Sequence, residues 1–394
     1  VAVFGLGQSG LATAQALNRS QAEVWAWDDS EAARARAAEA DIPLIDLYDC
    51  NWRELTTLVL SPGVPLHHPE PHPVVTLARE ARCEIIGDIE LLGRTQRWCN
   101  YIGITGTNGK TTVGYLLKAI LEAAGHKSGL IGTVGYEIGD QRLTASHTTP
   151  SAAVLQRLLR HMVQQGVMEA VIEVTSHALA LSRTSGCLFD TVVFTNLTRD
   201  HLDFHGDLET YFNTKLRLFS SKMFKPSTNA SAIRAFINLD DPYGYRVWEK
   251  CDVLAWGYAI DSHAAIRAED IVITFEGTSF TAQTPVGSFL VRSALVGRHN
   301  VYNILAAIGV GLSRGCSIEA IQRGIVSLRC VPGRFEKIDE GQKYGVVVDY
   351  AHTSDALEKL LDTARSLAIG RVITVFGCGG DRDKGKRSAM GKTA

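Results

Sequence analysis

The residues with the clearest chemical potential lie in a Gly-Thr-Asn-Gly-Lys-Thr turn at positions 106–111 of the 394-residue chain. An apolar run enters this turn, and an apolar pattern of helical period over 113–124 leaves it. Backbone N–H groups at the start of such a helix favour an anion. Lys110 can then reach nucleotide phosphates, and the Thr111 hydroxyl can ligate Mg²⁺. The turn predicts a nucleoside triphosphate site, although Ile104 breaks the strict phosphate-loop pattern and a tight turn with a surface lysine stays an alternative.

Two acidic features lie within or directly after predicted strands in the same region. Glu173 lies in the apolar run 170–177, where a buried carboxylate needs a partner or a metal. The segment 198–206 is dense in Asp and His, includes His201, and follows the apolar strand predicted over 190–196. We predict metal contacts from both features. A glutamate in a salt bridge on an edge strand and an ordinary loop histidine are the alternatives.

Two predicted helices carry further polar candidates. Lys215 lies four residues after Tyr211, on a helix whose apolar face ends at Phe219. A solvated helix lysine is the ordinary alternative for it. A second helix opens near Gly297 and places Asn300 and Asn303 on one face.

The N-terminus contains a second glycine turn, Gly5-Leu-Gly-Gln-Ser-Gly10, between a predicted strand and a helix. An acid, Asp28, ends the next strand about 20 residues on, as in dinucleotide-binding folds. The strand over 57–60 ends in the turn 61–65, at the edge where α/β sheets bind ligands. This pattern predicts a phosphorylated nucleotide on the first domain, or a structural turn without ligand.

Composition excludes several classes of protein. The net charge is −2 with 21% charged residues, so no nucleic-acid or membrane-surface partner is predicted. No run of 18 apolar residues predicts a membrane span, and no export signal begins the chain, so we expect a cytoplasmic protein. The eight cysteines are scattered without a C-x-x-C pair, which indicates reduced thiols.

The elements that must position these residues group into three predicted α/β domains, 1–93, 94–331 and 332–394. Residues 270–295 alternate apolar and polar side chains and predict antiparallel hairpins in the second domain. In the third domain we predict strands over 345–348 and 371–376 and expect the domain to be incomplete.

Taken together, these segments resemble the Mur ligases, the ATP-dependent amino-acid-adding enzymes of peptidoglycan synthesis. The segments that carry the resemblance are GTNGKTT (106–112), HTTPS (147–151), EVTSHAL (173–179), TNLTRDHLDFHG (195–206), YFNTKLRLF (211–219), GRHNVYN (297–303), PGRFE (332–336), DYAHTSDAL (349–357) and FGCGGDRDKGKR (376–387). The body resembles the E-type members, the UDP-N-acetylmuramoyl-tripeptide synthetases. The segments GLGQSG, SPGVPLHHP (61–69) and IIGDIELL (85–92) look like D-type members, which add D-glutamate one step earlier.

The resemblance implies a fold and a reaction. It implies a Rossmann-like UDP-binding first domain, a central P-loop ATPase-type domain with a mainly parallel sheet plus a small antiparallel sheet, and a partial Rossmann-like C-terminal domain. The implied reaction adds diaminopimelate or lysine to UDP-MurNAc-L-Ala-D-Glu through an acyl phosphate, with ATP and two Mg²⁺ ions. The implied partners are a UDP-MurNAc-peptide and an amino acid, and we expect a cytoplasmic bacterial monomer.

The resemblance also implies roles for individual residues. Catalytic roles are implied for Lys110, Lys215 and His201. ATP-binding roles are implied for Gly106, Thr107, Asn108, Gly109, Lys110, Thr111, Thr112, Asn300, Arg334 and Asp349. Metal ligation is implied for Thr111, Glu173, His201 and Lys215, the last as a CO₂-derived carbamate. Substrate contacts are implied for Gln8, Ser9, Asp28, Gly63, Thr148, Thr149, Ser176 and Arg183.

Two positions depart from the family pattern, and other functions stay open. Ser354 replaces a usual Pro, and Leu181 stands where a substrate-contacting Gln is common. The D-like front permits a D-glutamate-adding ligase acting on UDP-MurNAc-L-Ala. A folylpoly-γ-glutamate synthetase fits the HTTP and TRDHLDFHG strings poorly, and an NAD-dependent oxidoreductase leaves Lys215 without a role. A non-catalytic UDP-sugar-binding protein is the remaining alternative. The amino acid added is not readable, because the selecting motif is expected beyond residue 394.

Overall fold

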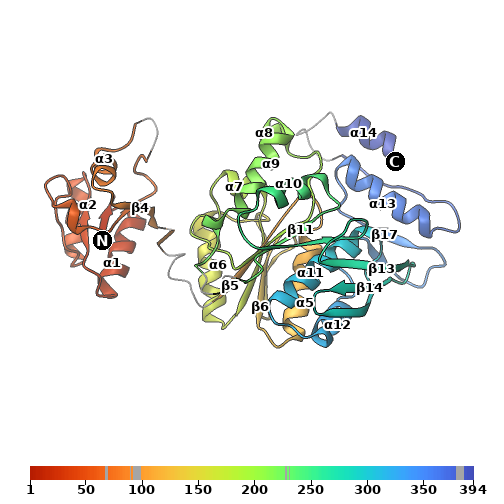
Figure 1. The fold of residues 1–394 in the computed structure, drawn as a ribbon. Coiled ribbons are helices and arrows are strands. Elements are labelled where there is room, and N and C mark those ends of the chain that lie inside the picture. Colours follow the sequence, from red (N-terminus) through yellow and green to blue (C-terminus); the bar gives the residue numbers. More distant parts are fainter. Residues whose placement is uncertain (67–69, 89, 92–98, 227–228, 230, 379–385) are drawn as a thin grey trace. The chain divides into compact units, whose positions relative to one another are not determined.

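The computed structural model describes residues 1–394 except 67–69, 89, 92–98, 227–228, 230 and 379–385 (Figure 1). Parts of the motifs 61–69, 85–92 and 376–387, and the predicted boundary at residue 93, lie outside the described residues. The chain forms two compact units, one of residues 1–96 with 185–187 and one of 97–184 with 188–394. The predicted boundaries of three domains stay a prediction. Within the described residues, every helix is too short or too polar to cross a membrane.

The N-terminal unit is built on a parallel four-stranded sheet with the order β2-β1-β3-β4. Apolar side chains cover both faces of the sheet in two buried clusters, as expected when helices follow parallel strands. Its elements are β1 (Ala2–Phe4), α1 (Gln8–Arg19), β2 (Trp25–Trp27), α2 (Glu31–Glu39), η1 (Trp52–Glu54), β3 (Thr57–Leu60), α3 (Pro73–Glu80) and β4 (Glu84–Gly87). The predicted Rossmann-like sheet is thereby confirmed.

The second unit contains an eleven-stranded sheet with the order β15-β14-β13-β12-β11-β10-β5-β9-β6-β7-β8. Its centre is parallel, and antiparallel hairpins extend it at both ends. The strands are β5 (Asn100–Thr105), β6 (Ser128–Ile131), β7 (Tyr136–Ile138), β8 (Gln141–Leu143), β9 (Glu169–Glu173), β10 (Thr191–Phe194), β11 (Ala235–Asn238), β12 (Ala255–Ala259), β13 (Ile266–Ile273), β14 (Thr278–Thr284) and β15 (Gly287–Ser293). The predicted mainly parallel sheet with antiparallel hairpins over 270–295 is confirmed.

Helices cover the parallel part of this sheet (Figure 1). They are α5 (Lys110–Ala123), α6 (Ala152–Gln164), α7 (Ser176–Ala180), α8 (Leu202–His205), α9 (Leu208–Leu216), α10 (Pro242–Lys250), α11 (Arg298–Ser313) and α12 (Ile318–Ser327), with short 3₁₀ turns η2 (Arg217–Phe219) and η3 (Ser221–Met223). The predicted apolar face of α5, from Val113 to Leu121, is buried against the sheet, α11 and α12. Each such side chain contributes about 1.5–3 kcal/mol on burial, so packing fixes the start of α5.

The C-terminal part of the second unit differs from the prediction. It contains β16 (Glu336–Ile338), β17 (Val346–Val348), α13 (Ser354–Leu367) and α14 (Lys386–Thr393), and the two strands pair antiparallel. Residues 371–376 form no strand, so that prediction is wrong for the structure described. Ile373 and Val375 are 70% and 94% exposed. Among the described residues no strand lies beside them to supply ladder hydrogen bonds, which a parallel strand requires.

Candidate active site

The glycine turn of residues 106–109 joins β5 to α5 and is fixed by the neighbouring strand β10. Because β5 and β10 are parallel and adjacent, their carboxyl ends meet at one edge of the sheet. Asn196 Oδ1 accepts from the Asn108 N–H at 2.9 Å, and Thr195 Oγ1 donates to the Asn108 carbonyl at 2.6 Å. Gly106 has φ 150°, and a Cβ there would lie 1.9 Å from Thr195 Oγ1. Only glycine therefore permits this close approach.

Two lysines converge on this turn. Lys110 Nζ donates to the carbonyls of Gly106 and Thr107 at 2.7 and 2.9 Å. Lys215 Nζ, from α9, donates to the same Gly106 carbonyl at 3.1 Å and lies 4.7 Å from the Tyr211 ring centre. The Lys215 side chain is 1% exposed, so a solvated lysine is the wrong interpretation. Burial, and then the charge of Lys110, hold the pKa of Lys215 well below its ordinary value.

Glu173 ends β9 and is fully buried at the same edge of the sheet. Its carboxylate accepts from the Thr111 hydroxyl at 3.1 Å and from the Thr133 N–H and hydroxyl at 2.9 and 3.0 Å. The described salt bridges do not include Glu173, and β9 lies between β5 and β6, so the edge-strand alternative is wrong. A buried carboxylate held only by neutral donors keeps lone pairs for a cation.

This donor set fits magnesium. Within the described part of the chain, no three His, Cys, Asp or Glu side chains gather closely enough to hold a metal by themselves. The oxygens at hand are the Glu173 carboxylate and the Thr111 hydroxyl, and both are hard ligands. Mg²⁺ is held in this way in nucleotide sites, by one or two protein oxygens together with phosphate oxygens and water. The residues therefore fit a magnesium ion that arrives with a nucleotide.

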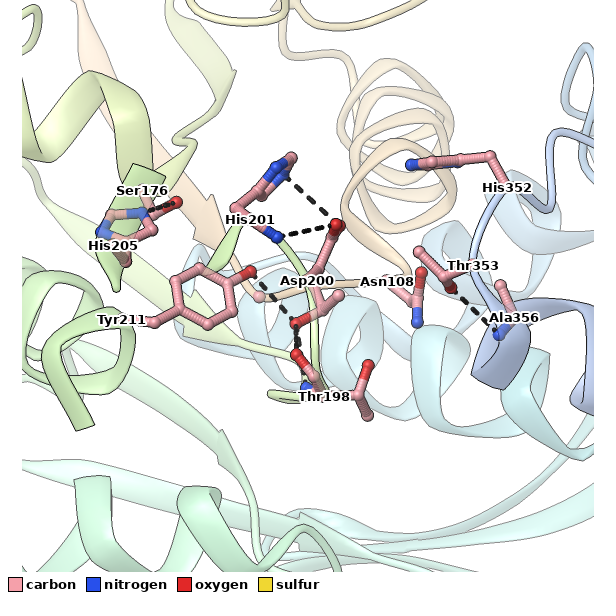
Figure 2. Close-up of polar contacts among 12 residues, drawn as sticks. Asn108, Ser176, Thr198, Asp200, His201, His205, Tyr211, His352, Thr353 and Ala356 are labelled. Atoms are coloured by element: carbon pink, nitrogen blue, oxygen red, sulfur yellow. Dashed lines mark hydrogen bonds and ion pairs between the residues drawn. The ribbon is translucent and has the colours of Figure 1, made fainter. Parts of the chain in front are cut away.

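A group of histidines lies beside the lysines (Figure 2). His201 directly precedes α8 with φ 54°, and its Nε2 lies 3.4 Å from Asp200 Oδ2. Burial, as the largest cause, lowers the pKa of His201 to about 4, so its imidazole is neutral at pH 7. The His177 ring packs against it with centroids 4.8 Å apart. His205 Nε2 pairs with Ser176 Oγ at 2.9 Å and links α8 to α7.

A hydroxyl chain ties this group to the glycine turn. The Tyr211 hydroxyl lies 3.2 Å from Thr107 Oγ1, and the Thr198 N–H donates to that oxygen at 3.0 Å (Figure 2). The Asp- and His-rich loop and Lys215 therefore meet the phosphate turn.

A cavity of about 410 Å³ opens next to the turn. Its walls include the predicted residues Asn108, Gly109, Thr112, Asn300, Arg334 and Asp349. Asn303 Nδ2 donates to Asn300 Oδ1 at 3.0 Å, which confirms that the two side chains share one helix face. Arg334 Nη2 donates to Thr111 Oγ1 at 3.4 Å, and Asp349 accepts from the N–H of Phe335 at 2.7 Å. Burial raises the pKa of Asp349.

The predicted peptide contacts gather around Glu173, but two of them are internal. Thr149 Oγ1 donates to the Glu173 carbonyl at 2.7 Å, and Arg183 Nη1 donates to the Thr149 carbonyl at 3.0 Å. Thr149 and Ser176 are each 1% exposed, so a ligand has almost no access to them. They act instead through their hydrogen bonds, which hold Glu173 and His205 in place. Thr148 pairs with Thr133 Oγ1 at 3.0 Å. Thr133 was missed from the sequence.

The N-terminal unit has a cavity of its own, about 700 Å³, at the carboxyl ends of its strands. It is lined by all the predicted residues of this unit, Gln8, Ser9, Asp28 and Gly63. The Asp28 carboxylate accepts from the N–H groups of Leu6 and Ser30, so it fixes the turn. The sequence missed Asp29, which pairs with His72 Nε2 at 3.1 Å and accepts from the Tyr48 hydroxyl at 2.8 Å.

Comparisons with known proteins relate this chain to one family. Residues 104–311 match the family model of the Mur ligase middle domain, and residues 333–394 match that of the Mur ligase glutamate ligase domain. A relative from Geobacter metallireducens, a UDP-N-acetylmuramoyl-L-alanyl-D-glutamate–2,6-diaminopimelate ligase, is 48% identical over 293 residues, 74% of this chain and 57% of the relative. A Bacillus cereus ligase of the same name is 44% identical over 322 residues, 82% and 65% of the two chains.

A solved structure of a ligase with that name is 30% identical, covers 88% of this chain and 75% of its own, and superposes with a TM-score of 0.63. A pseudomurein peptide ligase type C from Methanothermus fervidus, 20% identical with a TM-score of 0.54, shares the fold. The chain spans less than two thirds of the length of the curated relatives named above. The E-like body is confirmed, whereas the D-like front stays a prediction. The middle-domain model alone matches more than half of the sequence, and the chain belongs to the Mur ligase family.

Proposed function

We propose that this chain is an ATP-dependent ligase that adds diaminopimelate to UDP-MurNAc-L-Ala-D-Glu. The observation that carries the proposal is the convergence of Lys110, Lys215 and Glu173 on one turn, in a chain 48% identical to a diaminopimelate ligase. The names of the relatives favour diaminopimelate over lysine.

ATP would place its phosphates on the 106–111 turn and its nucleoside in the cavity of about 410 Å³. Lys110 would leave the carbonyls of Gly106 and Thr107 and take phosphate oxygens instead. Two Mg²⁺ ions would be held by Thr111, Glu173, His201 and a carbamate on Lys215. When bound, the two ions would neutralise charge on the transferring phosphoryl group.

Lys215 is suited to carbamate formation because its amine is buried and its pKa is lowered. A neutral amine can attack CO₂, forming an N–C bond and releasing one proton. The product is a carboxylate-like oxygen donor where the unmodified side chain has only a nitrogen.

The reaction would proceed in two steps, phosphorylation of the substrate carboxylate and then attack by the amine. A carboxylate oxygen of the D-glutamyl residue attacks the γ-phosphorus, and the bond to the ADP oxygen breaks, which gives an acyl phosphate and ADP. The diaminopimelate amine then attacks the acyl carbon, loses a proton, and expels phosphate. Activation divides one difficult condensation into two easier steps. Lys110 and the helix N-terminus would stabilise the charge at the phosphoryl group.

The UDP part of the substrate would bind to the N-terminal unit, in the cavity lined by Gln8, Ser9, Asp28 and Gly63. The peptide would reach the region of Thr148, Thr149, Ser176 and Arg183, where Thr149 and Ser176 act by holding Glu173 and His205. We propose a monomer acting in the bacterial cytoplasm, where ATP and the nucleotide precursor are supplied.

The test is phosphate release from ATP and Mg²⁺ with UDP-MurNAc-L-Ala-D-Glu and diaminopimelate, lysine or no amino acid. A parallel reaction supplies UDP-MurNAc-L-Ala and D-glutamate. Release that requires the dipeptide substrate and diaminopimelate supports the proposal. Release only with the shorter nucleotide and D-glutamate would overturn it in favour of the D-glutamate-adding ligase.

Lys215→Ala and Lys222→Ala form a matched pair for the carbamate. Lys222 is an exposed lysine in η3, so its removal should leave turnover unchanged. Lys215→Ala should lower turnover by at least about 100-fold. Partial rescue of Lys215→Ala by added short-chain carboxylates would support an acid-like role, whereas wild-type rates in this variant would contradict it.

A further inference from the structure

One side chain of the phosphate turn is bonded to a distant element. Asn108 Nδ2 donates to Asp355 Oδ2 at 3.2 Å, across 247 positions of sequence. The backbone of Asn108 is already fixed by Thr195 and Asn196, so its amide group can extend away from the turn. Figure 2 shows Asn108 next to Thr353 and Ala356 at the start of α13. The phosphate turn is therefore tied to the C-terminal part of the second unit.

Asp355 is well placed to hold this bond. It lies in the first turn of α13, where Thr353 caps the helix by accepting from the Ala356 N–H at 3.2 Å. A carboxylate in the first turn is favoured by the helix dipole. One turn later, Lys359 Nζ lies 3.0 Å from the Asp355 carboxylate. A charged acceptor shared by an amide and an ammonium is stronger than a neutral one.

The same helix forms a wall of the nucleotide cavity. Lys359, Leu360 and Thr363 line the cavity together with Asn300 and residues of the turn. The charge of Lys359 also reaches the interior, since it is one cause of the lowered pKa of His299. A shift of α13 would therefore change the turn and the cavity wall together.

We propose that Asp355 is a positioning residue that aligns α13 with the phosphate turn, acting through Asn108 and Lys359. The inference rests on the proposed function in taking ATP as the nucleotide. Because one carboxylate holds both groups, nucleotide binding and docking of the C-terminal part become coupled. Arg334, which reaches Thr111 from the same part of the chain, supplies a second link.

Asp355→Asn tests the charge with little change of shape, and Glu358→Gln is its matched control. Glu358 is exposed on the same helix, so the two substitutions remove the same charge from neighbouring positions. In the full chain, the Kd of a fluorescent ATP analogue should rise about tenfold for Asp355→Asn and remain unchanged for Glu358→Gln. We expect KM for ATP to rise with the Kd while kcat changes less, and Tm to match that of the control.

A double-substitution cycle identifies the route. Asn108→Ala should weaken binding of the ATP analogue. Adding Asp355→Asn to this variant should then raise the Kd by less than about twofold more, because the hydrogen bond between the two side chains is already lost. The inference would be overturned if the two substitutions changed the Kd by factors that multiply fully in the double variant. Equal Kd values for Asp355→Asn and Glu358→Gln would also overturn it. Failure of the wild-type chain to bind the analogue would instead overturn the proposed function, so the two failures are distinguishable.

Discussion

The two glycine turns of this chain share a backbone plan and differ in charge. Each follows a parallel strand and opens a helix, α1 in the N-terminal unit and α5 in the second. In the first turn, the Asp28 carboxylate and the Ser61 hydroxyl bond to the turn backbone. In the second, Lys110 and Lys215 bond to it, and Glu173 faces it through Thr111.

The difference shows what the backbone does and does not decide. A glycine turn before a helix prepares an anion site in both units. The side chains from neighbouring strands then set its chemistry. One fully buried amine, one partly buried amine and a buried carboxylate suit a triphosphate with metal, whereas an acid and a hydroxyl fix the first turn. Four predictions test this comparison.

The largest effect is expected for Lys110→Ala. Loss of the cation at the second turn should lower ATP turnover by about 10³-fold. UDP binding, measured by titration calorimetry, should be unchanged because Lys110 belongs to the other unit. Lys127→Ala, at an exposed lysine, is the control and should have wild-type turnover. A loss of UDP affinity in Lys110→Ala would show that the two turns do not act separately.

Gly10→Ala should be the most destabilising change in the first turn. A Cβ at Gly10 would lie 1.8 Å from the Gly5 carbonyl oxygen, so the backbone must move, at a cost of at least about 3 kcal/mol. Gly7→Ala is the matched control, because no atom lies within 4 Å of the added Cβ. In thermal unfolding, only Gly10→Ala should have a lower midpoint temperature than the wild-type chain. Equal transitions would contradict the close approach of α1 to Gly5.

Asp28→Ala tests whether the acid supports the turn. Its removal leaves the N–H groups of Leu6 and Ser30 without their acceptor, and we expect a loss of about 2 kcal/mol of unfolding free energy. Urea unfolding of this variant should be compared with that of Asp49→Ala, an exposed acid of the same unit. If Asp28→Ala weakens UDP binding without changing stability, the carboxylate serves the ligand instead of the turn.

The smallest effect concerns pH. Burial, followed by Lys359 and Arg334, lowers the pKa of His299 to about 4 in the second unit. Its ordinary pKa is about 6.5, so between these values the unfolded chain binds more protons and stability falls as pH falls. We expect a loss on the order of 1 kcal/mol between pH 7 and pH 5. His299→Gln should remove that part of the pH dependence in urea unfolding, and an unchanged slope would contradict it.

The sequence predicted the strands and helices that flank the two glycine turns and the hairpins of the second unit. Glycine turns, apolar strands and the helix face from Val113 to Leu121 are local patterns that the structure confirms. Residues 371–376 were predicted wrongly because strand formation depends on a neighbouring strand, which a local pattern cannot show. Thr133, Asp29 and Asp355 were missed because no spacing rule marks a single side chain that another segment will contact.

By itself, the sequence determined the phosphate turn, the strand and helix that flank it, and the family, because each rests on residues close together along the chain. Only the tertiary structure decided that Lys215 is buried beside Lys110, that Glu173 is held by neutral donors, and that Asp355 reaches Asn108. These facts depend on which strands end at the same edge of the sheet. They also depend on how completely side-chain packing excludes water from the site. Both arise from the whole fold, since burial and long-range contacts set the charge states that the chemistry requires.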